Sequence, residues 1–149
     1  MPTACRRAVP RRKKSVRLAR RALAVVLVDS SIWLQVEREG YDLGARVPYR
    51  EIATCPPIVQ EVLQGSDTEA RYWLNEMTLK ATLMLDDPMP LARFEEAAQL
   101  YRRCTKAGFQ LRSGVDCLIA VCAIANDVPI LARDRDFTHI AKVVGLRLF

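Results

Sequence analysis

The chain has 149 residues, with 23 Lys and Arg, 17 Asp and Glu and one His, for a formal net charge of +6. This length suits one domain of roughly 100–200 residues, and a composition of 50% hydrophobic and 27% charged residues excludes a disordered or fibrous protein. A single histidine disfavours a zinc site built from several histidines and leaves none to spare beside a Ser-His-Asp triad.

The positive charge is concentrated at the start of the chain. Residues 1–22 hold nine basic residues and no acidic one, so residues 23–149 carry 14 basic and 17 acidic residues, a net charge of −3. We predict a flexible basic extension over 1–22, followed by one domain over 23–149. A basic arm usually binds nucleic acid or another acidic surface. The excess acid in the domain raises the question of which carboxylates serve chemistry.

The first apolar segment, Leu23–Val28, is rich in Val and Leu and predicts a buried parallel strand. It is far shorter than the roughly 20 residues of a membrane span. Asp29 ends the segment and no small-residue cleavage site follows, which disfavours a secretory signal. The five cysteines form no C-x-x-C pair. Their number is odd, and Cys117 and Cys122 lie in an apolar run, which favours buried thiols in a reducing cytoplasm over a disulfide framework.

Beyond this strand, helical and strand-like patterns alternate. Helices are predicted at Ser30–Glu39, Pro56–Gln64, Asp67–Leu79 (starting on an acidic cap), Pro90–Ala107, Ser113–Ala125 and Phe137–Val144. Further strands are predicted at Arg50–Cys55, Ala81–Leu85, Pro129–Ala132 and Leu146–Phe149. Strands separated by helices indicate an α/β fold with a mostly parallel central sheet flanked by helices.

Apolar faces on these helices are predicted mainly as core, with a protein interface as the alternative. The face of the helix over Pro90–Ala107 consists of Leu91, Phe94, Ala97, Ala98 and Tyr101. The same prediction applies to Ile32, Trp33 and Leu74 on earlier helices. Helical periodicity carries this prediction, because residues three or four apart share a face.

Four carboxylates are predicted near the carboxyl ends of strands, where parallel sheets bind ligands. Asp29 follows the first strand and Asp134 follows the strand over 129–132. Glu61 lies one turn into the helix after the second strand, and Asp116 lies in the first turn of its helix. Each has a structural alternative: Asp29 and Asp134 could cap helices, Asp116 could complete a capping box, and Glu61 could be an ordinary exposed residue.

The surroundings of Asp116 favour a functional role. Residues 117–125 carry no polar side chain, which is typical of a buried helix, and burying an ionised carboxylate without a partner is costly. Carboxylates gathered at one sheet edge would also repel one another unless a cation lay between them. Oxygen ligands favour magnesium or manganese over zinc, and such a site suits hydrolysis of a phosphodiester.

Four segments in order resemble the PIN-domain ribonucleases, specifically the VapC toxins of bacterial toxin–antitoxin systems. They are V-L-V-D-S-S-I-W, P-P-I-V-Q-E-V-L-Q-G, R-S-G-V-D-C-L-I-A-V-C-A-I-A and P-I-L-A-R-D-R-D-F. The resemblance spans about Val25 to Leu148 and implies a Rossmann-like PIN domain. It further implies magnesium-dependent endoribonuclease activity, with manganese as a substitute, and an RNA substrate. The implied partners are a VapB-like antitoxin and a second copy in a homodimer.

The resemblance also implies roles for individual residues. The implied catalytic carboxylates are Asp29, Glu61, Asp116 and Asp134. The implied metal ligands are Asp29, Asp116, Asp134 and Asp136. Candidates for binding the substrate are Ser30, Ser31, Arg112, Arg133 and Arg135. Two features depart from the family: Ala132 stands where a Thr or Ser is common, and the stretch Gly40–Pro48 is shorter than in many relatives.

Two other functions compete with the nuclease. A non-catalytic module could bind RNA or a partner through the basic arm, with strong dependence on salt, although four retained carboxylates argue against it. A phosphoaspartate receiver is also an α/β domain with acids at strand ends. It needs a lysine after a late strand, and Lys106 and Lys142 are poorly placed for that role.

Overall fold

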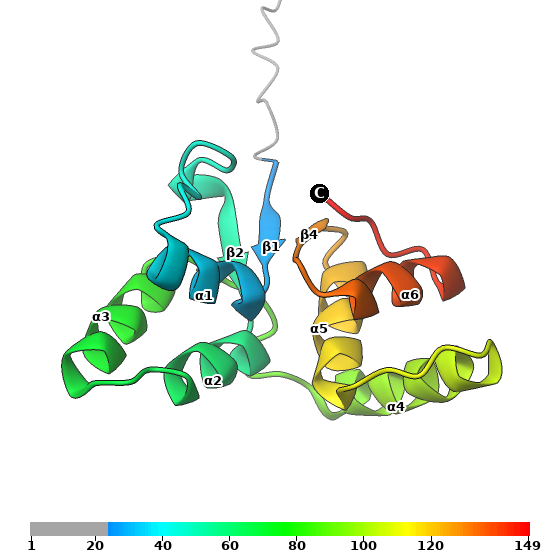
Figure 1. Cartoon of the computed structure of the whole chain (residues 1–149). Coiled ribbons are helices and arrows are strands. Elements are labelled where there is room, and N and C mark those ends of the chain that lie inside the picture. The colour runs from blue at the N-terminus through cyan, green and yellow to red at the C-terminus, as the bar shows by residue number, and fades with distance from the viewer. Residues whose placement is uncertain (1–23) are drawn as a thin grey trace, which may run out of the picture.

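The computed structural model describes residues 24–149, so the predicted basic extension over 1–22 lies outside the described residues. The centre of the described part is a four-stranded, all-parallel sheet in the order β3-β2-β1-β4 (Figure 1). The strands are β1 (Val26–Val28), β2 (Ile52–Thr54), β3 (Leu83–Met84) and β4 (Ile130–Leu131). The helices are α1 (Ser30–Glu39), α2 (Pro56–Gln64), α3 (Glu69–Lys80), α4 (Leu91–Lys106), α5 (Gly114–Ala125) and α6 (Arg135–Val143), with a 3-10 turn at Tyr49–Glu51. The predicted α/β fold is confirmed.

Strand β1 lies between β2 and β4, so the chain extends the sheet first on one side of β1 and then on the other. The backbone N–H of Asp29 donates to the carbonyl of Leu131 at 2.9 Å, which joins the carboxyl ends of β1 and β4. In an open parallel sheet, a reversal of this kind opens a crevice at the strand ends. The strand predicted over 146–149 is reduced to one parallel bridge between Ile130 and Leu148.

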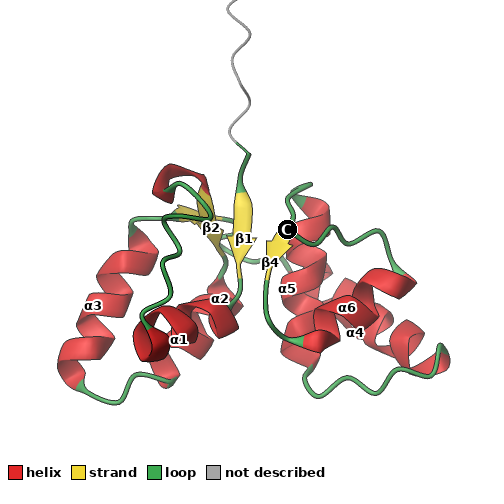
Figure 2. Cartoon of the chain, turned by 45° about the horizontal axis from the view of Figure 1, so that its top comes forward, coloured by secondary structure: helices red, strands yellow, loops and turns green. Residues whose placement is uncertain are grey.

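The helices gather in two groups beside the strands. Helices α1, α2 and α3 lie on one side and α4, α5 and α6 on the other, as two views of the chain agree (Figures 1 and 2). With this grouping, the carboxyl ends of β1 and β4 open between α1 of one group and α6 of the other (Figure 1).

Within residues 24–149, none of these helices combines the length and the apolar character that crossing a bilayer requires.

Helix α5 is the hydrophobic centre of its group. Every residue of its segment Ile119–Ala123 is buried, as are Phe137 and Ile140 of α6. Full burial of one such large side chain stabilises the fold by about 1.5–3 kcal/mol. Because this apolar helix begins at the crevice, its first turn carries Asp116 to the edge of the core.

Local sequence determines most element boundaries. Helix α1 ends where Gly40 adopts a positive φ of 65°, and α2 begins at the prolines, both as predicted. Helix α3 departs slightly from prediction, because Thr68 rather than Asp67 caps it by accepting the N–H of Arg71 at 3.2 Å. Helix α6 begins at Arg135, two residues earlier than predicted, because Asp134 caps it.

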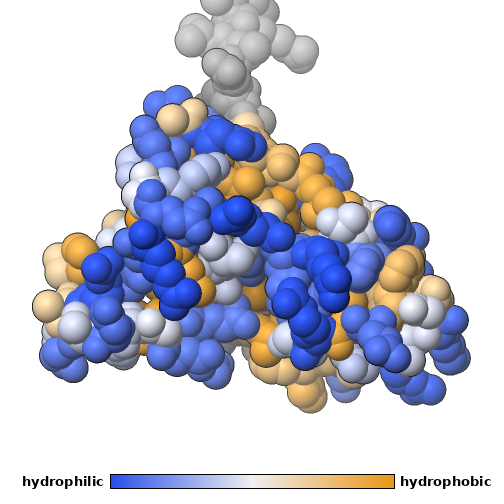
Figure 3. Space-filling view, in the orientation of Figure 1, coloured by the Kyte–Doolittle hydropathy of each residue, from blue (hydrophilic) through white to orange (hydrophobic). Residues whose placement is uncertain are grey.

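The prediction that apolar helix faces pack in the core is correct for Ile32 and Trp33 and wrong for several others. The side chains of Leu91 and Phe94 on α4 are 72% and 50% exposed, and Tyr101 is 40% exposed. Leu74 on α3 is also exposed. Figure 3 shows apolar side chains at the lower edge of the molecule, near α4 and α5. The reason is that α4 packs through a neighbouring stripe, made of Ala97, Leu100 and Cys104.

Candidate active site

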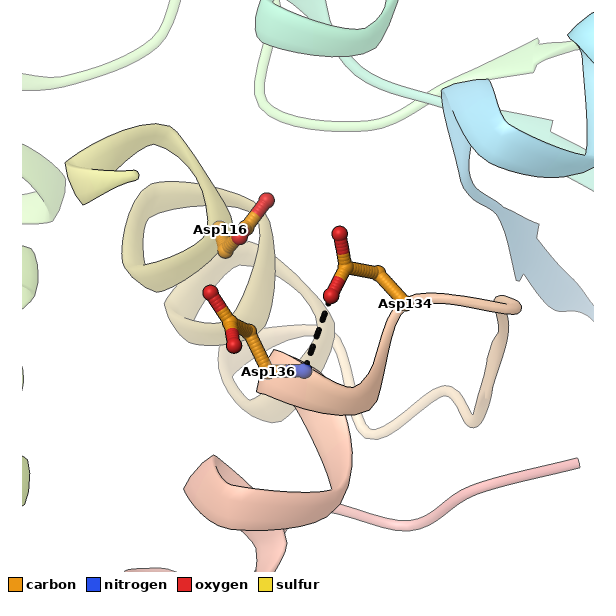
Figure 4. Close-up of side chains that lie close together, drawn as sticks. All are labelled: Asp116, Asp134 and Asp136. Atoms are coloured by element: carbon orange, nitrogen blue, oxygen red, sulfur yellow. Dashed lines mark hydrogen bonds between the residues drawn. The ribbon is translucent and has the colours of Figure 1, made fainter. Parts of the chain in front are cut away.

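Five carboxylates converge on the crevice from four helices. Asp29 precedes α1, Glu61 lies on α2, Asp116 lies in the first turn of α5, and Asp134 and Asp136 begin α6. The structure brings Asp116, Asp134 and Asp136 closest together, with one carboxylate oxygen of each within 4.8 Å of the others. Figure 4 shows these three side chains gathered between α5 and α6. Of the four carboxylates predicted at the strand ends, Asp116 and Asp134 belong to this close group, which Asp136 completes.

Asp29 and Asp134 each cap a helix and also belong to the group of carboxylates at the crevice. Asp29 Oδ2 accepts the backbone N–H of Ser31 at 3.0 Å, and Asp134 Oδ1 accepts the backbone N–H of Asp136 at 2.9 Å. The capping box considered for Asp116 does not form, because Ser113 Oγ caps α5 by accepting the N–H of Val115. Among the described residues, no donor reaches the Asp116 carboxylate.

Asp116 is the carboxylate that the fold perturbs most clearly. Its side chain is 7% exposed, and burial, followed by the negative charges of Asp29 and Asp134, raises its pKa to about 7. The charges of Glu61 and Asp136 add to this effect. Without a cation, an ionised Asp116 is therefore repelled by the neighbouring carboxylates, and a divalent ion would relieve that repulsion.

Two serines hold neighbouring carboxylates in place. Burial raises the pKa of Asp29, and the hydroxyl and backbone N–H of Ser31 oppose that shift. Burial likewise raises the pKa of Glu61, and the hydroxyl of Ser30 opposes it by donating to Oε2 at 2.7 Å. The structure thus engages both predicted substrate-binding serines with carboxylates, so their positions support the acidic cluster directly.

The three predicted substrate-binding arginines lie together at the edge of the cluster. Arg112, Arg133 and Arg135 line an open hollow of about 540 Å³ with Ser31 and Asp134. The guanidinium of Arg112 pairs with Asp134, and that of Arg133 lies 3.4 Å from Glu39. Hydrophilic side chains cover this face between α1 and α6 (Figure 3). Cations beside an acidic centre are what a polyanionic substrate requires.

Sequence reasoning missed one residue of the site. His139 lies one turn after Asp136 on α6, with its Nδ1 3.9 Å from Asp136 Oδ1. The spacing D-x-x-H, which puts both side chains on one helix face, was a usable signal. A single histidine points to neither a multi-histidine zinc site nor a catalytic triad, so composition does not single it out.

The donor set fits a hard cation. The clustered groups are carboxylates, whose oxygens suit Mg²⁺ and Mn²⁺. The described cysteines are free and buried, and burial raises the pKa of the Cys117 thiol to about 12, which keeps it protonated and poor as a metal ligand. The site therefore offers oxygen rather than sulfur.

Comparison with known proteins identifies the family of the chain. The sequence model of the PIN domain matches residues 26–143. A VapC ribonuclease from Mycobacterium bovis and ribonuclease VapC11 from Mycobacterium tuberculosis are each 33% identical over 132 residues, covering 83% of this chain and 96% of the relative. The solved structure of VapBC-5 from Mycobacterium tuberculosis, a member of the VapBC family of toxin–antitoxin systems, has a TM-score of 0.56 at 20% identity. That similarity covers 85% of this chain and 98% of the other.

Proposed function

The chain belongs to the PIN-domain family and is related to VapC ribonucleases, and on this basis we propose that it is the toxin of a type II toxin–antitoxin pair. It is an endoribonuclease that hydrolyses phosphodiester bonds of RNA. The observation that carries this function is the cluster of Asp116, Asp134 and Asp136 at the strand ends, with three arginines beside it. This arrangement pairs an acidic centre with cations that can hold a polyanion.

The proposed cofactor is Mg²⁺, with Mn²⁺ as a substitute. We assign Asp29, Asp116, Asp134 and Asp136 as its ligands, because an oxygen-only set suits a hard cation. A bound divalent cation supplies charge neutralisation and activation of water for attack on phosphorus. The raised pKa of Asp116 supports the assignment, since such a shift marks a carboxylate that lacks a compensating positive charge.

The residues of the chain divide the remaining tasks. Glu61 Oε2 accepts a hydrogen bond from the Ser30 hydroxyl. The other oxygen, Oε1, is assigned to accept the proton of the attacking water. Asp29, Asp116 and Asp134 complete the catalytic carboxylates. Arg112, Arg133 and Arg135, which line the hollow, are assigned to the RNA phosphates. Cleavage would leave a 3′ hydroxyl and a 5′ phosphate.

An RNA cleavage assay with the full chain tests the proposal. We expect cleavage to require Mg²⁺, to stop with EDTA and to resume when excess Mg²⁺ is added. Asp29→Ala should lower the rate by at least about 100-fold, because a metal ligand is lost. Full activity in a folded Asp29→Ala protein, or in EDTA, would refute the residue assignment.

The competing function is RNA binding through the basic arm without catalysis. It concerns residues 1–22, which we still propose to be an extension separate from the PIN domain over 23–149. A chain lacking residues 1–22 distinguishes the two, because a nuclease should keep its Mg²⁺-dependent cleavage, whereas a basic-arm module should lose its RNA binding. We place the protein in the cytoplasm, which suits its buried free thiols and an RNA substrate.

The proposed protein partner is a VapB-like antitoxin, since the solved structure of VapBC-5 is of a toxin–antitoxin system. Induction of the chain alone should arrest growth, and co-expression of the antitoxin should restore it. A short upstream reading frame for a DNA-binding protein would identify that antitoxin. Absence of toxicity would weaken the toxin assignment and leave the nuclease assay as the independent test of activity.

A second copy of the chain is the other proposed partner, and α4 is the face that suits it. Its exposed residues Phe94 and Tyr101 border a groove of about 760 Å³ against α5. Glu95 and Arg102 flank Ala98 on the same exposed face, and neither has an ion-pair partner within residues 24–149. A two-fold axis at Ala98 would bring Glu95 of each copy beside Arg102 of the other. Such a self-complementary patch is what a symmetric dimer requires.

A further inference from the structure

We propose that His139 is a positioning residue that fixes Asp136 by a hydrogen bond from Nδ1–H to Oδ1. This inference rests on the proposed metal site, to which Asp136 belongs. The side chain of Asp136 is 1% exposed. Its Oδ2 accepts the backbone N–H of Arg112 at 2.7 Å. Its other oxygen, Oδ1, is buried and has no donor in the described part of the chain.

The Nδ1 atom of His139 could donate the hydrogen bond that Asp136 Oδ1 lacks within residues 24–149. It is also buried without a partner among the described residues, and it lies 3.9 Å from Asp136 Oδ1. A buried polar atom without a partner costs about 1–3 kcal/mol. A movement of about 1 Å would bring the two atoms to the usual N–H···O distance. One hydrogen bond would then satisfy both atoms.

The ring of His139 is packed against a neighbouring aromatic side chain. Phe109, from the loop between α4 and α5, stacks on it with ring centres 4.9 Å apart and planes 16° apart. Lys142 lies over the Phe109 ring at 5.7 Å from its centre. The stacking restricts the plane of the half-buried imidazole, and Nδ1 lies on the side of the ring near Asp136.

Asp136 would then be held from two sides. Arg112 of the loop fixes Oδ2 through its backbone N–H, and His139 of α6 fixes Oδ1. Groups that hydrogen-bond to metal-binding carboxylates orient them, and their loss typically lowers metal affinity by about 10–100-fold. His139 therefore acts through Asp136 rather than on the RNA. Removal of the His139 side chain should therefore weaken cation binding more than it destabilises the fold.

Two substitutions separate the hydrogen bond from the stacking. His139→Phe keeps an aromatic ring for Phe109 and removes the donor. His139→Asn loses the ring but carries its amide nitrogen two bonds from Cβ, as Nδ1 is. Binding of Mn²⁺ to the full chain is measured by titration calorimetry, and thermal melts are recorded without metal. We expect about 10-fold weaker Mn²⁺ binding in His139→Phe and recovery to within about threefold of the parent in His139→Asn.

Each other outcome overturns the inference. Parent-like Mn²⁺ binding by His139→Phe would show that the donor is not used. Equal losses in both variants, with equally lowered metal-free melting temperatures, would show that His139 serves only packing. If the parent chain folds and binds no Mn²⁺, the metal site itself is refuted. That failure is seen before any variant is measured, so it is distinguishable from failure of the histidine's role.

Discussion

The hydroxyl of Ser31 donates to Asp29 Oδ2 at 2.6 Å, and Ser31 Oγ in turn accepts the backbone N–H of Arg133 at 3.1 Å. Asp29 follows β1, and Arg133 follows β4. One side chain therefore joins both sides of the crevice directly above the sheet. It also holds the first carboxylate of the cluster and the backbone that leads to Asp134.

We expect Ser31→Ala to lower the free energy of unfolding by about 1–2 kcal/mol, because it removes the hydroxyl that donates to Asp29 and leaves the backbone N–H of Arg133 without its acceptor. The Mg²⁺ concentration for half-maximal cleavage should rise, since Asp29 loses the hydroxyl that orients it. Ser31→Thr is the matched control because it retains the hydroxyl. Urea denaturation and Mg²⁺ titration of RNA cleavage check both effects. Equal behaviour of the two variants would contradict the role of the hydroxyl.

The raised pKa of Asp116 predicts how the metal-free protein responds to pH. Its value is 3.8 without the fold and about 7 within it, so the folded state binds the proton more tightly. Stability is therefore greatest below about pH 4 with respect to this group, and it declines as the pH rises through 7. Burial shifts the pKa values of Asp29 and Glu61 in the same direction.

Asp116→Asn tests this linkage. The variant should abolish cleavage and should stabilise the metal-free protein at pH 8 by about 1–3 kcal/mol, because the buried charge is removed. Its stability should vary less between pH 4 and 7 than that of the parent. Mg²⁺ should stabilise the parent more at pH 8 than at pH 5. Denaturant melts between pH 4 and pH 8 measure the three effects on stability, and the RNA cleavage assay measures activity. If the stability of the variant depended on pH as strongly as that of the parent, the assignment would be contradicted.

Arg135→Ala isolates the contribution of one cation to RNA binding. Arg135 is exposed, lines the hollow and has no ion-pair partner in the part of the chain that the structure describes. We expect a several-fold increase in KM with little change in kcat. The slope of log affinity against log salt should fall by about 0.7, the value for one contact with single-stranded nucleic acid.

Lys80→Ala is the control for Arg135→Ala. Lys80 ends α3 and pairs with Glu76 at 2.8 Å, so its removal subtracts the same charge outside the hollow. If both variants lower RNA affinity equally, net charge rather than the hollow holds the substrate. A fall in kcat alone would instead assign Arg135 to the chemical step.

The sequence predicted most of the cluster because topology alone brings strand ends together. Asp29 and Asp134 follow neighbouring parallel strands, so their meeting depends on strand order and not on side-chain detail. Periodicity predicted which residues of α4 share a face, but it does not say which face meets the core. Phe94 was therefore predicted wrongly. The contact between His139 and Phe109 joins two separate segments, so no local pattern could have predicted it.

Charge substitutions on α4 test the proposed dimer. Glu95→Arg should place a cation of the other copy beside each Arg102, and Arg102→Glu should likewise place a carboxylate beside each Glu95, so each single variant should be monomeric. The double variant Glu95→Arg with Arg102→Glu should recover the dimer, because the two-fold relation exchanges the partners. Sedimentation equilibrium of the purified chain at low and moderate salt measures the state.

The position of the two-fold axis has its own test at Ala98. Only a residue on the axis faces its own copy, so Ala98→Cys should form a disulfide-linked dimer, which requires Cα atoms within about 7 Å. Glu69→Arg on α3, an exposed charge reversal outside the patch, should leave the dimer intact. A dimer that survives both single variants on α4, or a monomeric parent chain, would refute this interface. Antitoxin binding lost in the single variants, with no change of dimer, would assign the groove to the antitoxin instead.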